Sequence, residues 1–264
     1  MAWQTPKTDW TGADGVRFGD INRIEGNILD LKENKVELSD FNNLREAFDN
    51  AMYDISNRVS LQSLPVGTEF GLHENGILVP FIKLADNYES SGRVLAVRKD
   101  CLYISQLLSG NSTVYEDCLI DIWLNGPYIE TLNSVVQNVL SNVGIKSQGT
   151  FSMSTINRKV FILSISELQL VSQGMPIEGS SIAYFNTNAR RVSRISGSTT
   201  NYWTRTINTS TGNACYVSAG GTVATAIASE AALGIRPALT LPGTLEVTTG
   251  IPNTTNVMAT AEVI

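Results

Sequence analysis

The chain has 264 residues, with 19 Lys and Arg against 25 Asp and Glu, one His and a formal net charge of −6. An acidic balance argues against a nucleic-acid-binding protein, because such proteins usually carry a basic surface. A single histidine removes most metal sites and most His-based catalysis. Charged residues make up only 17% of the chain, which argues against disorder of the whole chain.

The N-terminus has neither a basic start nor an apolar core, so we expect no secretory signal. No stretch approaches 18 consecutive apolar residues, and we therefore expect no membrane insertion. The chain is expected to fold in a cytoplasm and to reach any extracellular site without a signal of its own.

Charge is distributed unevenly along the chain, which predicts two kinds of surface. Residues 1–62 carry 11 acids and 7 bases, whereas residues 176–264 carry 4 acids, 5 bases and 24 Ser or Thr. We expect a helical segment over residues 1–62 for attachment and oligomerisation, a domain over 63–247, and an extended C-terminal arm over 248–264.

The first segment shows helical periodicity in two stretches, 20–32 and 41–59. Their apolar residues recur every three or four positions, which places them on one stripe of each helix. Two such helices make a thin core, so we expect packing on another subunit, with a trimer favoured, or on another protein; the alternative is a helical cap folded onto the following domain. The residues assigned to attachment or oligomerisation are Trp3, Trp10, Ile21, Ile24, Ile28, Phe41, Leu44, Phe48 and Ile55.

After residue 65 the pattern changes to short strands. An Asn-Gly pair at residues 75–76 predicts a hairpin between strands at 68–72 and 77–84. Further strands are expected at 94–98, 102–104, 159–163, 201–206, 214–218, 222–227 and 235–241, and a helix at 127–142. Residues 180–201 are polar and turn-rich, which indicates an irregular loop region. The fold class is therefore α+β, with many short strands and long loops.

A set of motifs in the second part resembles a known pattern. The motifs are VGTEF at 66–70, DIWLN at 121–125, KVFILSISEL at 159–168, NYWTRT at 201–206, NACYV at 213–217 and GIRPALTL at 234–241. In this order they resemble an uncharacterised domain family of phage tail and surface proteins in Gram-positive bacteria. That family looks related to the C-type-lectin-like fold, which formylglycine-generating enzymes and some phage receptor-binding proteins share. The resemblance covers about residues 63–246 and implies a C-type-lectin-like domain.

The N-terminal segment carries a second resemblance. WQTPKTDW at 3–10 and GDINRIEGN at 19–27 are similar to the opening of many phage tail, baseplate and fibre-associated proteins, where the segment attaches the protein to the virion. The two resemblances together imply a virion protein whose partners are other virion proteins.

Six residues are candidates for contact with a receptor or partner, including a host cell-surface glycan. Trp203 and Arg205 suggest a sugar-binding pair, since aromatic faces stack on sugars and arginine donates to hydroxyls; the alternative places both in the core framework. Tyr184, Arg190, Arg191 and Arg194 lie in the polar loop region, where the alternative is a solvated loop.

Neither a metal nor a cofactor is expected. Glu116, Asp117 and Asp121 cluster in sequence, but a calcium site needs six to eight oxygens in a set geometry, and no calcium-loop motif is present. Catalysis is not expected either, because His73 would have to serve in any Ser–His–Asp or Cys–His site. Cys101, Cys118 and Cys215 do not match the cysteine pair of the formylglycine-generating enzymes.

Three functions remain open. The first is a structural and receptor-binding component of a phage tail or tail-like particle, at the fibre or baseplate. The second is a decoration, collar or neck protein that does not bind a receptor. The third is an enzyme acting on a cell-wall polymer, which a pair of carboxylates could support.

Overall fold

The structure is a computed structural model that describes residues 42–47, 58–102, 114–149, 152–172, 174–229, 233–248 and 261–263. The chain divides into two compact units, Met1–Tyr53 and Asp54–Ile264. In the first unit, residues 42–47 form a helix inside the predicted stretch 41–59, and Leu44 there is exposed. The other residues assigned to attachment lie outside the described ranges: Trp3, Trp10, Ile21, Ile24, Ile28, Phe41, Phe48 and Ile55.

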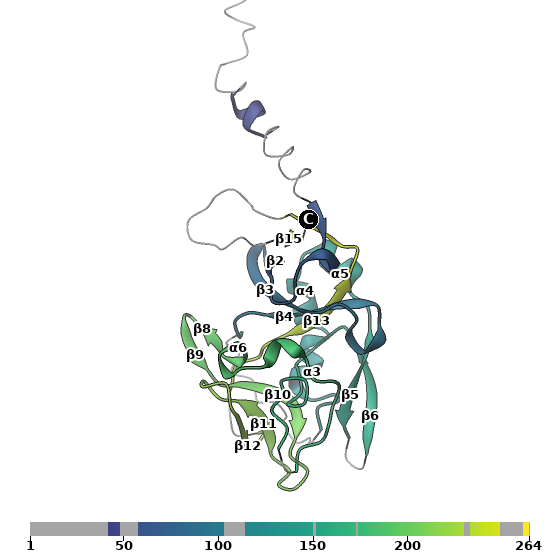
Figure 1. Cartoon of the computed structure of the whole chain (residues 1–264), viewed down its shortest axis with the longest axis vertical. Coiled ribbons are helices and arrows are strands. Elements are labelled where there is room, and N and C mark those ends of the chain that lie inside the picture. The colour runs from purple at the N-terminus through teal and green to yellow at the C-terminus, as the bar shows by residue number, and fades with distance from the viewer. Residues whose placement is uncertain are drawn as a thin grey trace, which may run out of the picture. The chain divides into compact units, whose positions relative to one another are not determined.

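The second unit contains one eight-stranded sheet (Figure 1). Its strands are, in spatial order, β1 (Arg58–Ser60), β14 (Glu246–Thr248), β15 (Ala261–Val263), β2 (Glu69–Glu74), β3 (Ile77–Ala85), β4 (Arg93–Arg98), β13 (Ala238–Pro242) and β7 (Val160–Phe161). Neighbouring strands are antiparallel except β15 and β2, which are parallel. The C-terminal strand β15 thus lies inside the sheet, between β14 and β2.

Three smaller sheets and four α-helices are also present in the described part of this unit. One sheet consists of β10 (Tyr202–Ile207), β11 (Ala214–Val217) and β12 (Val223–Ala226); two hairpins pair β5 (Val143–Gln148) with β6 (Met153–Arg158) and β8 (Ser193–Ile195) with β9 (Ser198–Thr200). The helices are α3 (Leu119–Leu124), α4 (Pro127–Thr131), α5 (Ser134–Val139) and α6 (Asn188–Arg191). Single 3₁₀ turns lie at η1 (Leu61–Ser63), η2 (Tyr88–Ser90) and η3 (Ala183–Phe185).

The described part of the chain is a mixture of helix and strand in which strands dominate, so the predicted mixed class is confirmed. The Asn75-Gly76 hairpin is also confirmed: both residues have positive φ, 50° and 76°, as a type I′ turn requires. Pairing of β1 with β14 ties residues 58–60 to the second unit, so that unit begins before the expected boundary at residue 62.

The single helix expected at 127–142 is wrong, because two short helices occupy this stretch. Leu132 leaves the helical region with φ −74° and ψ 150°, which ends α4. Asn133 then caps α5, since its side-chain oxygen accepts a hydrogen bond from the Val136 N–H at 2.9 Å. The capping residue therefore separates two helices that share one apolar pattern.

The core of the second unit lies around β4 and β13, whose apolar side chains are buried on both faces. A fully buried lysine, Lys83 of β3, fixes the edge of this core. Its ammonium donates to the carbonyl oxygens of Leu61, Gln62 and Leu64 at 3.1, 2.7 and 2.6 Å, which satisfies the backbone at the end of η1. Within the described ranges, no helix is long and apolar enough to cross a membrane.

Candidate functional site: a polar pocket beside α3

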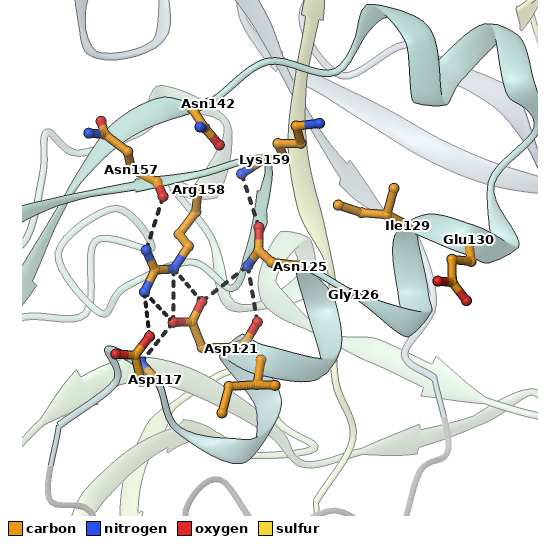
Figure 2. Close-up of a pocket in the computed structure, with 11 residues that line it drawn as sticks. Asp117, Asp121, Asn125, Gly126, Ile129, Glu130, Asn142, Asn157, Arg158 and Lys159 are labelled. Carbon is orange, nitrogen blue, oxygen red and sulfur yellow. Dashed lines mark hydrogen bonds and ion pairs between the residues drawn. The ribbon is translucent and has the colours of Figure 1, made fainter.

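A pocket of about 450 Å³ opens between α3, the start of α4 and the hairpin β5–β6 (Figure 2). Polar and charged side chains from segments far apart in the sequence line most of it. Ile122 and Ile129 supply the apolar part of the lining, and Ile122 is well exposed. A concave site with a few polar groups on a partly apolar wall is the usual form of a small-ligand site.

An ion pair between α3 and β6 forms one side of the pocket. The Arg158 Nε lies 2.8 Å from both carboxylate oxygens of Asp121, and its Nη2 lies 2.7 Å from Asp121 Oδ2 and 3.1 Å from Asp117 Oδ1. The Asp121 carboxylate is buried, so the pair is far less screened than one on the surface. The hydrogen bond from Arg158 to Asp121, together with the negative charge of Asp121, raises the pKa of the Arg158 guanidinium. Burial lowers the same pKa but does not outweigh this effect.

Asn125, at the end of α3, joins the helix to the main sheet. Its side-chain oxygen accepts from the N–H groups of Lys159 and Val160 at 3.1 and 3.3 Å, and its amide donates to the Val160 carbonyl oxygen at 2.9 Å. The same amide donates to Asp121. Because Asp121 and Asn125 are four residues apart, one helix face presents both to β6 and β7.

Four side chains in the lining have hydrogen-bonding capacity left for a ligand. Those of Glu130, Asn142, Asn157 and Lys159 make no hydrogen bond or ion pair with another described residue. They combine one carboxylate, one ammonium and two amides in a lining that also contains the two isoleucines. Arg158 adds a donor, because its Nη1 gives one bond to the Asn157 carbonyl oxygen at 3.0 Å and carries a second hydrogen.

The acidic cluster weighed for calcium lies at this pocket, but a guanidinium holds two of its members. Arg158 takes up both oxygens of Asp121 and one of Asp117, while Glu116 is exposed. In the part of the chain that the structure describes, no three His, Cys, Asp or Glu residues are grouped so that they could hold a metal ion.

Three of the six predicted receptor contacts are buried in the core and have no surface to offer a receptor. Trp203 and Arg205 are fully buried, so the framework interpretation of these two residues holds and the sugar-binding interpretation is corrected. The same correction applies to Arg191, whose guanidinium donates to the carbonyl oxygens of Leu168 at 2.6 Å and Phe185 at 2.7 Å. Arg205 is likewise satisfied inside the fold, because its guanidinium donates to the carbonyl oxygens of Ile162 and Glu178 at 3.0 and 2.9 Å.

The other three predicted contacts lie nearer the surface. Arg190 is exposed and its guanidinium lies 5.1 Å from the centre of the half-buried Tyr184 ring, an arrangement typical of a cation–π pair. Arg194 is exposed on β8. The structure therefore brings together Tyr184 and Arg190, and it leaves Arg194 on a separate hairpin.

The buried arginine, Arg205, is held by two glutamates. Glu167 is fully buried, and its carboxylate accepts from both terminal nitrogens of Arg205, at 2.7 and 2.8 Å. Glu178, also fully buried, accepts from the Gln148 N–H at 2.6 Å and from the Thr206 hydroxyl, and burial raises the pKa of its carboxyl. Arg205 thus pairs with the Glu167 carboxylate and donates to the main-chain carbonyl oxygen of Glu178 at 2.9 Å, so both glutamates are tied to β10.

The pocket residues were mostly missed from the sequence. Asp117 and Asp121 were singled out, but Arg158 lies 37 residues beyond Asp121, and no local pattern pairs the two. The spacing of Asp121 and Asn125 in the DIWLN motif was the one available signal, since polar residues four apart on a short apolar helix share a face.

A family model described as a domain of unknown function, DUF6273, matches residues 91–243. The chain belongs to the DUF6273 family. The DUF6273 match begins just before β4 and ends just after β13, so it contains the whole pocket and the Arg205 cluster. No curated protein and no solved structure matches this DUF6273 chain.

Proposed function

We propose that this DUF6273 chain is a structural component of a bacteriophage or phage-tail-like particle, associated with the tail fibre or baseplate. In this proposal the first unit attaches the chain to other virion proteins, as a trimer, and the second unit binds a carbohydrate of the host surface. The support for attachment is the resemblance of residues 3–10 and 19–27 to virion attachment segments. The DUF6273 match, residues 91–243, lies entirely inside residues 63–246, the span that resembles a C-type-lectin-like domain.

The observation that supports carbohydrate binding is the set of unpaired polar side chains in the pocket beside α3. A sugar presents several hydroxyls, each both donor and acceptor, next to patches of C–H. Asn142 and Asn157 offer donors and acceptors together, Lys159 offers donors and Glu130 offers acceptors. The isoleucine side chains supply apolar surface for the C–H patches of the ring.

The Arg158–Asp121 pair supports binding rather than turnover. Its bidentate geometry fixes the wall of the pocket before a ligand arrives, which lowers the entropy cost of binding. It also engages both oxygens of the Asp121 carboxylate with a guanidinium. We therefore assign no catalytic step to this pocket.

Binding is tested by isothermal titration of the full chain with soluble fragments of host wall carbohydrate. Lys159→Gln should weaken binding at least tenfold, because it removes an ammonium from the lining. Lys146→Gln is the matched control: Lys146 lies on the same hairpin, donates to Thr155 Oγ1 at 2.8 Å and does not line the pocket. Equal weakening by both variants would refute the site.

Attachment is tested by the composition of purified particles and by cryo-electron microscopy. Absence of the chain from particles would refute the virion assignment. Presence in particles without binding to any host wall fraction would favour a decoration, collar or neck protein. Turnover of wall polymer by the full chain would instead favour the enzyme.

A further inference from the structure

A second pocket, of about 480 Å³, lies between the turn η2 and residues 180–183. It shares no lining residue with the pocket beside α3. Much of its wall is apolar and comes from Val66, Leu84, Ile182 and two alanines. Serine hydroxyls from Ser90, Ser180 and Ser181 supply the neighbouring polar groups.

Glu89 is the one charged side chain among the described residues that line this second pocket. It is half-buried, and its Oε1 accepts a hydrogen bond from the Ser180 N–H at 3.1 Å. No described residue provides a cation or a donor to its other carboxylate oxygen. The carboxylate thus faces a partly apolar pocket with half of its accepting capacity unused.

The backbone holds Glu89 in an uncommon conformation. Glu89 has φ 45° and ψ 38°, and Ser90 after it has φ 60°, so two consecutive residues with side chains occupy the left-handed region. Such residues are energetically unfavourable and persist where the surrounding structure holds them. Here two features hold the turn: the hydrogen bond that the Ser180 N–H donates to the Glu89 carboxylate, and the burial of Tyr88, the residue before Glu89.

Negative charge also lies directly behind the wall of this pocket. A Cβ atom placed on Gly179 would lie 3.2 Å from Glu89 Oε1 and 2.9 Å from Glu167 Oε1. The two carboxylates therefore both lie next to Gly179. Glu167 is buried and is paired with the guanidinium of Arg205, which donates to both of its carboxylate oxygens. The Glu89 carboxylate has no such cation beside it among the described residues, so its charge is uncompensated at the pocket wall, and such a charge acts over several ångströms in a medium of low dielectric.

We propose that this second pocket binds a small ligand with a primary ammonium group on a short aliphatic body. The ammonium donates to the open oxygen of Glu89 and to a serine hydroxyl, and the aliphatic body lies against Val66, Leu84 and Ile182. The unpaired carboxylate of Glu89 disfavours an anion. A divalent cation would lack ligands, since it needs about six oxygens and the pocket offers one open carboxylate.

The test compares n-pentylammonium with n-pentanol, two probes of equal length that differ in charge. Binding to the full chain is followed by nuclear magnetic resonance, with the methyl groups of Val66 and Ile182 reporting the location. We expect n-pentylammonium to bind at least tenfold more tightly than n-pentanol, and this preference to fall as salt is added.

Glu89→Gln removes the charge, keeps the side-chain length and should abolish the preference for the ammonium. Glu116→Gln, at an exposed acid outside this pocket, should retain it. If Glu89→Gln does not fold, Ala183→Phe provides a second variant, because it fills the pocket without changing any charge and should abolish binding of both probes.

The proposal is overturned if n-pentanol binds as tightly as n-pentylammonium, if Glu89→Gln keeps the preference, or if neither probe shifts the reporting methyl groups. None of these outcomes bears on carbohydrate binding beside α3, because that site has a separate lining and separate variants.

Discussion

Glu167→Gln should strongly destabilise the second unit. The carboxylate of Glu167 accepts four hydrogen bonds, two from Arg205 at 2.7 and 2.8 Å, one from the Ser164 N–H at 2.8 Å and one from the Tyr88 hydroxyl at 2.5 Å. The donor groups of all four bonds belong to three residues, Arg205, Ser164 and Tyr88. A glutamine amide replaces one acceptor with a donor, so at least one buried donor loses its partner, and Arg205 loses the carboxylate that pairs with it.

The expected magnitude follows from burial. Because Glu167 and Arg205 are both fully buried, removing one charge leaves the other without compensation, which costs about 3–5 kcal/mol. A chain of this size loses ~2–4 °C in melting temperature per kcal/mol, so the midpoint should fall by roughly 6–20 °C. Urea unfolding of the full chain, followed by tryptophan fluorescence and circular dichroism, measures the free energy directly.

A matched control is the pair Arg58–Glu246 between β1 and β14. Its atoms lie 3.4 Å apart and its side chains are 38% and 61% exposed, so solvent screens the interaction. Glu246→Gln should therefore change the free energy of unfolding by less than about 1 kcal/mol. A loss for Glu167→Gln no larger than that of the control would refute the buried ion pair as a stabilising element.

Three further predictions concern the same unit. Burial raises the pKa of the Glu178 carboxyl in the folded state, so its contribution to stability is full below the unfolded value and is lost as pH rises. We therefore compare the free energy of unfolding of the unaltered chain with that of Glu178→Gln. The first minus the second should decrease from about pH 4 upward, and an increase would contradict this prediction. Gly221→Ala should destabilise the fold far more than Gly212→Ala. Both positions have positive φ, but only at Gly221 would the new Cβ meet a backbone oxygen, that of Asn188, at 2.2 Å. Equal urea midpoints for the two variants would contradict this prediction. Burial raises the pKa of the three cysteine thiols to about 11 or about 12, so iodoacetamide at pH 8 should label them only after unfolding. Labelling of the native chain would show that a thiol is accessible.

Local pattern was enough to predict many elements of the second unit. Alternating and continuous apolar runs predicted β3, β4, β10, β11, β12 and β13 within a few residues, because a strand between two packed layers must carry apolar side chains along its length. The Asn75-Gly76 pair predicted its hairpin, since these residues tolerate the positive φ that the turn needs. Residues 127–142 were predicted to form a single helix, because the spacing of apolar residues does not show where a capping residue ends one helix and starts the next.

Tertiary structure decided what the polar residues do. Arg205 suggested a ligand contact in sequence, yet residues 202–207 are all buried, because other segments cover both faces of β10. Its partner Glu167 is 38 residues away, and Arg158 reaches Asp121 only because the hairpin β5–β6 returns to α3. Composition and local pattern thus determined the mixed class of helix and strand and most strand positions, since these depend on burial and turn geometry near each residue. Which charges are buried, which are paired and which face a pocket depends on contacts between distant segments, and these exist only in the folded chain.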